Sequence, residues 1–187
     1  GEGIINIYYN KDMLDAAGIE APTTVEDAWT WDEYYEICKK LTTDEVYGGN
    51  FIQEKSGEWL IVAFQPFLIA NGVELLSEDG SKANGYINSE AAVETGEYIQ
   101  KFADEGLINI DPTATEFQEG GCATKLAGAW IMPTLEDVDF NWGVTFIPQQ
   151  KQNAGSTSGG WTVGVTPNCE NVDAAMEFIH YLSSPEA

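Results

Sequence analysis

Two tryptophans that follow glycines are the residues best suited to bind a small molecule. Trp130 comes two positions after Gly128, and Trp161 directly follows the pair Gly159 and Gly160. Glycine allows the backbone to approach a ligand closely, and an indole ring offers a large apolar face with a polar edge. Each ring is therefore either a platform for a flat ligand or a tryptophan of the core.

Four further candidates, Trp59, Asn71, Glu74 and Glu136, lie near the ends of predicted helices or strands. An aromatic ring can stack on the flat apolar face of a ligand, while carboxylates and amides bond the polar groups at its edge. Trp59 opens a predicted buried helix, whereas Trp29, Trp31 and Trp142 are expected to pack in the core. Each of the polar candidates, taken alone, is more often exposed to solvent than bound to a ligand. The complete candidate set is Trp130, Trp161, Gly160, Trp59, Asn71, Glu74 and Glu136.

The sequence contains no compact catalytic or metal-binding motif. The single histidine, His180, falls in the middle of a predicted helix, and the cysteines Cys38, Cys122 and Cys169 are widely spaced without a CxxC pair. The acidic residues do not have the spacing of a calcium loop. We therefore expect no metal, no cofactor and no catalytic residue. A glycosidase that uses two carboxylates remains a less favoured alternative, because 31 Asp and Glu residues always supply a pair.

The charge balance excludes several classes of partner. The 187 residues include 31 acidic side chains against 8 lysines and no arginine, which gives a net charge of −23. Nucleic acids and anionic membranes need a basic face, and a bidentate clamp for phosphate or carboxylate needs arginine. A neutral ligand fits this composition best.

Hydrophobic periodicity predicts strands that alternate with helices, which is typical of an α/β fold. A Thr30–Glu33 capping box and Asn10 mark two helix starts, and a third helix starts at Asn88 or Ser89. The predicted strands are 4–9, 47–52, 125–132, 142–148 and 161–166. The main predicted helices are 11–17, one that follows Thr30 and ends near 42–43, 59–70, one from 88 or 89 to the glycine at 106, and 172–182. Residues 77–80 are predicted as a hairpin tip.

Several stretches, in order and spacing, resemble one family. They are Tyr8–Leu14, Trp31–Glu33, Ala70–Gly72, Phe117–Gly120, Gly128–Trp130, Trp142–Val144, Gly159–Trp161 and Leu182–Glu186. On these residues the chain resembles the extracellular solute-binding proteins of bacterial ABC importers, the sugar-binding family that includes maltose-binding protein.

The resemblance implies a type II periplasmic-binding-protein-like lobe, with a mixed sheet flanked by helices. Residues 1–154 would form the second lobe, and residues 155–187 would form a strand and a helix that return to pack on a first lobe.

The same resemblance implies a function. The protein would be a non-catalytic component of an ABC importer that binds a neutral mono- or oligosaccharide between its lobes and delivers it to the permease transmembrane subunits. It would be monomeric when full length and extracytoplasmic, either periplasmic or a cell-surface lipoprotein, although this sequence shows no signal peptide. A surface carbohydrate-binding or adhesion module is the alternative.

Overall fold

The computed structural model describes residues 3–51, 58–153, 158–159 and 162–186, without the side chains of 58–61 and 158–159. The chain divides into two compact units, which are described separately. The larger unit is Gly3–Ser158, and the smaller one combines Gly1–Glu2 with Gly159–Ala187. The short strand β5 (Ser158–Gly159) stands at the boundary between them.

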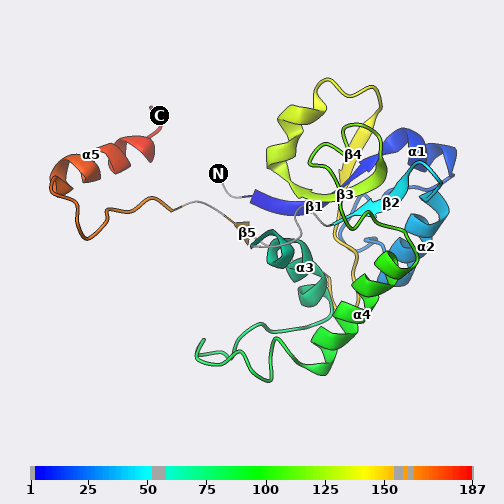
Figure 1. Ribbon diagram of the computed structural model, residues 1–187, viewed down its shortest axis with the longest axis horizontal. Coiled ribbons are helices and arrows are strands. Elements are labelled where there is room, and N and C mark those ends of the chain that lie inside the picture. Colours follow the sequence, from blue (N-terminus) through cyan, green and yellow to red (C-terminus); the bar gives the residue numbers. More distant parts are fainter. Residues whose placement is uncertain (1–2, 52–57, 154–157, 160–161, 187) are drawn as a thin grey trace. The chain divides into compact units, whose positions relative to one another are not determined.

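A mixed β-sheet forms the centre of the larger unit (Figure 1). Its strands lie in the order β2-β3-β1-β4, and β1 pairs antiparallel with both β3 and β4, whereas β2 pairs parallel with β3. Ile7 lies opposite both Leu126 and Thr145, which fixes the register of the three antiparallel strands. The strands are β1 (Gly3–Asn10), β2 (Tyr47–Asn50), β3 (Cys122–Gly128) and β4 (Trp142–Thr145).

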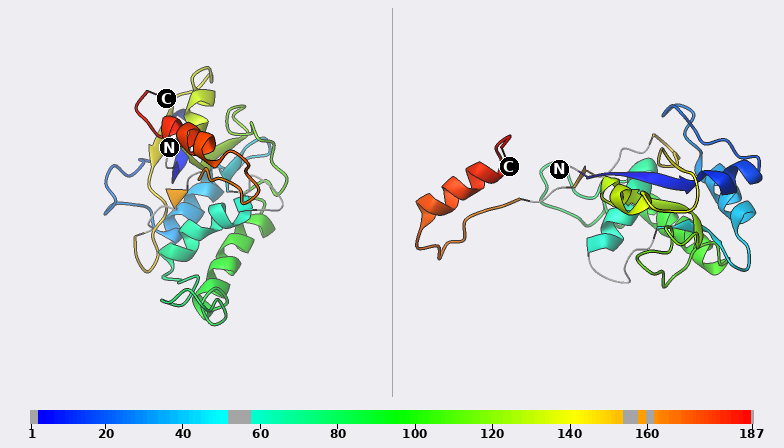
Figure 2. Two further views of the ribbon diagram at one scale, coloured as in Figure 1. Left: turned by 90° about the vertical axis from the view of Figure 1, so that its left-hand side faces the viewer. Right: turned by 90° about the horizontal axis from the view of Figure 1, so that it is seen from above.

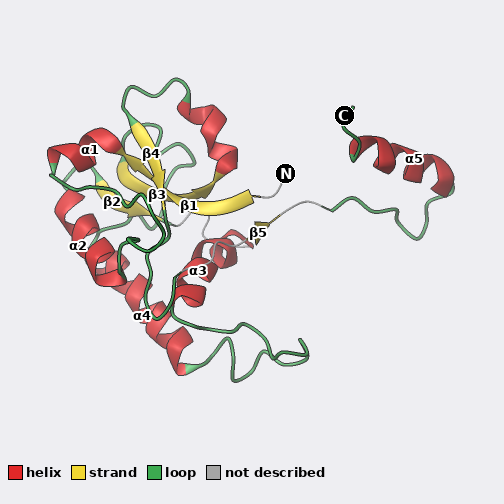
Figure 3. Ribbon diagram, turned by 180° about the vertical axis from the view of Figure 1, so that it is seen from behind, coloured by secondary structure: helices red, strands yellow, loops and turns green. Residues whose placement is uncertain are grey.

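Helices cover one face of this sheet and bury the larger apolar cluster (Figures 1 and 3). Ile7 and Leu126 of the sheet belong to the same cluster as Tyr34, Phe67 and Phe102 of the helices. Alternate residues of a strand point to opposite faces, so β1 can contribute Ile5 and Ile7 here and Tyr8 to the other face. The covering helices are α2 (Trp31–Leu41), α3 (Glu58–Ala70) and α4 (Glu90–Asp104).

The helix starts confirm the capping predictions. Asn10 accepts from the Met13 amide before α1 (Lys11–Ala16), and Ser89 accepts from the Ala92 amide before α4. Thr30 and Glu33 form the predicted capping box, with both reciprocal hydrogen bonds present. These bonds satisfy amides that no intrahelical carbonyl can reach, so the local sequence suffices to place the helix starts.

A smaller apolar cluster lies on the opposite face of the sheet. Tyr8 of β1 and Ala127 of β3 belong to it together with Phe117, Ile131 and Leu135. Ile131 and Leu135 are part of a 3₁₀ helix, η1 (Ala129–Leu135), which follows β3 directly. This cluster therefore ties η1 to the sheet.

Three predicted elements are wrong. The strand predicted over 125–132 ends at Gly128, because the chain turns into η1 and buries Ile131 and Leu135. No strand forms over the described part, 162–166, of the strand predicted at 161–166; a strand needs a neighbouring strand to pair with. The turn around Asp79 is present, but the described segment 73–89 has no strands to make it a hairpin.

The smaller unit contains the helix α5 (Val172–Leu182), coloured orange to red in Figure 2. Its bounds match the predicted helix, but none of its 11 residues is buried. Across the described part of the chain, no helix combines the length and apolar character that a bilayer crossing needs.

Candidate functional site

Trp130 lies on η1 with its ring directly over the backbone of Gly128. A Cβ added at Gly128 would lie only 1.9 Å from the indole carbon Cζ3 and 2.4 Å from Cε3. Gly128 has an extended backbone (φ −101°) that any residue can adopt, so the ring, and not the turn, requires a glycine here. Trp130 retains 41% of its accessible surface. The glycine thus supports one side of the ring while a large part of the indole stays exposed.

The exposed indole has the properties of a stacking platform for a flat apolar face. Its position corrects one detail of the prediction, since Trp130 belongs to a 3₁₀ helix and not to the end of a strand. The Gly-x-Trp spacing is nevertheless the sequence signal that identifies this feature, because the glycine lies directly beneath the ring. Glu136 is exposed and follows η1 immediately.

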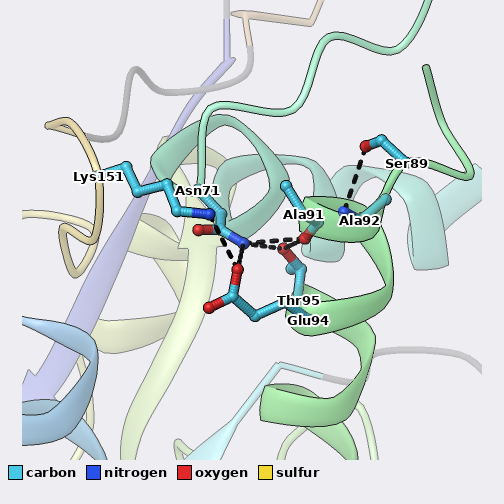
Figure 4. Close-up of polar contacts among 7 residues, drawn as sticks. All are labelled: Asn71, Ser89, Ala91, Ala92, Glu94, Thr95 and Lys151. Carbon is cyan, nitrogen blue, oxygen red and sulfur yellow. Dashed lines mark hydrogen bonds and ion pairs between the residues drawn. The ribbon is translucent and has the colours of Figure 1, made fainter. Parts of the chain in front are cut away.

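Asn71 is buried and connects two helices (Figure 4). Its side-chain nitrogen donates to the Ala91 carbonyl (2.8 Å), to Glu94 Oε2 (3.0 Å) and to Thr95 Oγ1 (3.2 Å) of α4. Glu94 also forms an ion pair with Lys151 at 2.9 Å. Asn71 therefore holds the end of α3 against α4. The expectation that its side chain is more often solvated than bound to a ligand is wrong, because the side chain is buried.

Of the remaining candidates, only Glu74 has a described side chain. Glu74 is exposed in the segment after α3. Trp59 falls within α3, but its side chain lies outside the described residues, as do Trp161 and Gly160 entirely. Among the candidates with described side chains, only Trp130 presents a large exposed aromatic surface.

Burial has made two of the nucleophilic groups unreactive. Burial raises the pKa of the Cys38 thiol to about 12, and it raises the pKa of the Cys122 thiol as well. A thiol is nucleophilic as the thiolate, so neither cysteine is prepared for chemistry. Among the described residues, no three His, Cys, Asp or Glu side chains gather as a metal site.

A family model described as bacterial extracellular solute-binding protein matches residues 2–187. The chain belongs to this family. Among curated relatives of this solute-binding chain, the galactooligosaccharide-binding protein of Bacillus subtilis is 26% identical, with 95% of this chain and 42% of the relative covered. The sn-glycerol-3-phosphate-binding periplasmic protein of Agrobacterium fabrum is 25% identical, with 95% and 42% covered.

Solved structures of the family share the fold. The maltose-bound MalE3 of T. maritima superimposes with a TM-score of 0.78 at 23% identity, over 98% of this chain and 49% of that chain. This similarity confirms the predicted α/β lobe of the type II periplasmic-binding-protein kind. This solute-binding chain spans about half the length of the relatives that it matches.

Proposed function

We propose that this chain is about half of the solute-binding component of an ABC importer, and that it binds a neutral mono- or oligosaccharide on Trp130. The observation that carries the proposal is the indole ring supported by Gly128 and left 41% exposed. An aromatic ring held in this way binds a sugar through its apolar C–H face, without any charge on the ligand. The protein performs no covalent chemistry in this proposal.

The composition supports a neutral ligand over an anionic one. One relative is named for glycerol-3-phosphate, so a phosphate ester is the second candidate ligand. Phosphate recognition favours arginine forks and a positive field, whereas this chain has no arginine and a net charge of −23. A neutral carbohydrate, as in the name of the galactooligosaccharide-binding relative, needs neither.

The other candidates from the sequence are proposed as further ligand contacts. Trp161, Gly160 and Trp59 are proposed as further apolar contacts, and Glu74 and Glu136 as exposed carboxylates that accept from sugar hydroxyls. The buried Asn71 is proposed to act by holding α3 on α4, so its contribution to binding would be indirect.

The smaller unit is proposed to complete its packing outside this chain. Val172, Met176, Phe178, Tyr181 and Leu182 of α5 are all exposed, and the matched relatives are about twice as long as this chain. We propose that residues 155–187 return to a first lobe, which covers this apolar helix and supplies the other wall of the cleft. Closure of two lobes on the ligand would then precede docking on the membrane permease outside the cytoplasm.

Calorimetry of the full-length protein tests this function. We expect binding of galacto- or maltooligosaccharides, no binding of glycerol-3-phosphate, and about a tenfold or greater loss of affinity for Trp130→Ala, since an aromatic stack contributes on the order of 1 kcal/mol beyond its buried area. Met132→Ala is the matched control, because Met132 is 45% exposed on the same 3₁₀ helix. Tight binding of the phosphate ester without any sugar binding would contradict the proposal.

Two further measurements separate the alternatives. Release of sugar from a chromogenic glycoside, abolished by a single Asp or Glu substitution, would establish a glycosidase. Sugar binding by a protein whose gene has no permease gene beside it would favour a surface carbohydrate-binding or adhesion module. The importer proposal expects neither result.

A further inference from the structure

The proposed platform residue Trp130 lies on a short 3₁₀ helix, η1. A 3₁₀ helix has poorer hydrogen-bond geometry than an α-helix and persists only in short pieces. η1 spans Ala129–Leu135 and its N-terminal cap, Gly128, makes no side-chain hydrogen bond. Contacts from outside η1 are therefore expected to contribute to the orientation of the indole.

Apolar contacts fix the side of η1 that faces the sheet. Ile131 and Leu135 are 6% and 2% exposed and pack in the smaller cluster with Phe117. Trp142 Nε1 donates to the Leu135 carbonyl at 3.2 Å. These contacts fix the buried side of η1 and its C-terminal end, whereas apolar packing itself is not directional.

One hydrogen bond from a different segment, joined to one within η1, supplies such a directional contact. Gln118 Nε2 donates to Thr134 Oγ1 at 2.8 Å, and the Thr134 hydroxyl donates to the Ile131 carbonyl at 2.6 Å. Because a hydroxyl has one proton, the Thr134 oxygen must accept from Gln118 while it donates to Ile131. The Ile131 carbonyl belongs to the residue next to Trp130, so this brace acts one residue away from the ring.

Gln118 is itself held in place. Its neighbour Phe117 is fully buried, and the carboxylate of Glu116 accepts from Asn109 Nδ2 at 2.6 Å and from Asn50 Nδ2 at 2.5 Å. Asn50 is the last residue of β2. The brace therefore connects the edge strand of the sheet, through the turn at 116–118, to the 3₁₀ helix that carries the ring.

We propose that Gln118 and Thr134 are positioning residues that set the orientation of Trp130 and so tune its affinity for the ligand. The consequence for affinity rests on the proposed function, whereas the orientation of the ring does not. Neither residue has to touch the ligand. Gln118 lies within the Phe117–Gly120 stretch and Thr134 lies four residues after Trp130, so the proposal gives a physical reason for the two stretches to occur together.

The test uses Thr134→Val, which keeps the shape of the side chain and removes its hydroxyl, with Thr134→Ser as the matched control. The first readout is ¹⁹F NMR of the chain labelled with 5-fluorotryptophan, in which Trp130→Phe assigns the Trp130 resonance. We expect Thr134→Val to shift or broaden that resonance and Thr134→Ser to restore it. The melting temperature should change little, because Thr134 is exposed.

The second readout is the affinity of the full-length protein for a maltooligosaccharide by calorimetry. We expect Thr134→Val, which removes both hydrogen bonds of the Thr134 hydroxyl, to weaken binding by about threefold or more, because one hydrogen bond contributes on the order of 1 kcal/mol. Thr134→Ser should bind like the parent protein. Gln118→Met removes the brace from its other end and should reproduce both effects, so it carries the test if Thr134→Val does not fold.

The outcomes distinguish this proposal from the one that it rests on. An unchanged Trp130 resonance in both Thr134→Val and Gln118→Met would overturn the brace, whatever the affinity. Unchanged sugar affinity in Trp130→Ala would instead overturn the platform, and the NMR result would still decide whether the brace orients the ring.

Discussion

Helices α4 and α5 are both amphipathic, yet only α4 has a partner for its apolar side. In α4, Thr95, Ile99 and Phe102 are buried, and Phe102 lies within ring contact of four aromatic side chains. In α5 no residue is buried, and Phe178 keeps 59% of its surface exposed. The periodicity of a sequence can specify a helix locally, but burial requires a second surface that the helix does not encode.

We expect the largest difference between α4 and α5 when one phenylalanine in each helix is replaced by alanine. Phe102→Ala should reduce the free energy of unfolding by about 3–5 kcal/mol, because Phe102 is fully buried and its removal leaves a cavity. Phe178→Ala should change it by less than about 0.5 kcal/mol in this chain. Urea unfolding followed by near-ultraviolet circular dichroism measures both, and equal losses would break the contrast between the regions.

The next comparison is between Gly128, where an added Cβ would clash with a neighbour, and Gly164, where it would not. Gly128→Ala forces the Trp130 ring to move, since the new Cβ would lie 1.9 Å from Cζ3. We expect an overpacking cost of about 1–3 kcal/mol and, in the full-length protein, about a tenfold or greater loss of sugar affinity. Gly164→Ala in the smaller unit is the control, because a Cβ there meets no atom within 4 Å. Parent-like affinity in Gly128→Ala would show that the ring does not bind the ligand.

A substitution within α4 should strengthen the buried helix further. Gly96 lies inside α4, and an added Cβ there meets no atom within 4 Å. Gly96→Ala should raise the free energy of unfolding by about 0.5–1 kcal/mol through helix propensity. The control Gly106→Ala should instead lose about 1–2 kcal/mol, because Gly106 has φ +68°. Thermal unfolding measures both variants. A lower stability of Gly96→Ala would contradict the presence of free space for a Cβ at this position.

The smallest expected effect is the pH dependence of the contact between α3 and α4. The hydrogen bond from Asn71, followed by that from Lys151, lowers the pKa of Glu94 from 4.5. A carboxyl whose pKa is lower in the folded state stabilises the fold above its unfolded pKa and loses that contribution as the pH falls through the folded value. Glu94→Gln should therefore reduce the loss of stability below pH 4.5.

The urea midpoint as a function of pH measures this effect, with Glu97→Gln on the same helix as control. The parent chain and Glu97→Gln should lose stability more steeply below pH 4.5 than Glu94→Gln. An identical acid slope in all three would show that the Asn71–Glu94–Lys151 contact adds nothing to the folded state.

Much of the larger unit could be predicted from short-range sequence signals. Asn10, Thr30 and Ser89 mark the helix starts because their side chains cap amides only three residues away. The strand over 125–132 could not be predicted correctly, because its second half was decided by the burial of Ile131 and Leu135 against Phe117. Local propensity carries no information about such a distant neighbour.

In the candidate site, too, some features could be predicted from the local sequence and others depended on distant residues. Gly128 and Trp130 are two positions apart, and this spacing marked Trp130 as a candidate. Only the structure shows that the glycine lies beneath the ring. Asn71 was expected to be solvated or to bind the ligand, but it is buried because α4, some 20 residues further along the chain, supplies three acceptors for its amide.

The sequence by itself predicted the α/β class and the capped helix starts that the structure shows. It also singled out Trp130 and a neutral ligand as candidates. The tertiary structure alone decided that Trp130 lies on a 3₁₀ helix, that Asn71 is internal, and that Gln118 reaches Thr134. The reason is physical. Caps, turns and composition act within a few residues, whereas burial and hydrogen bonds between distant segments exist only once the chain has folded.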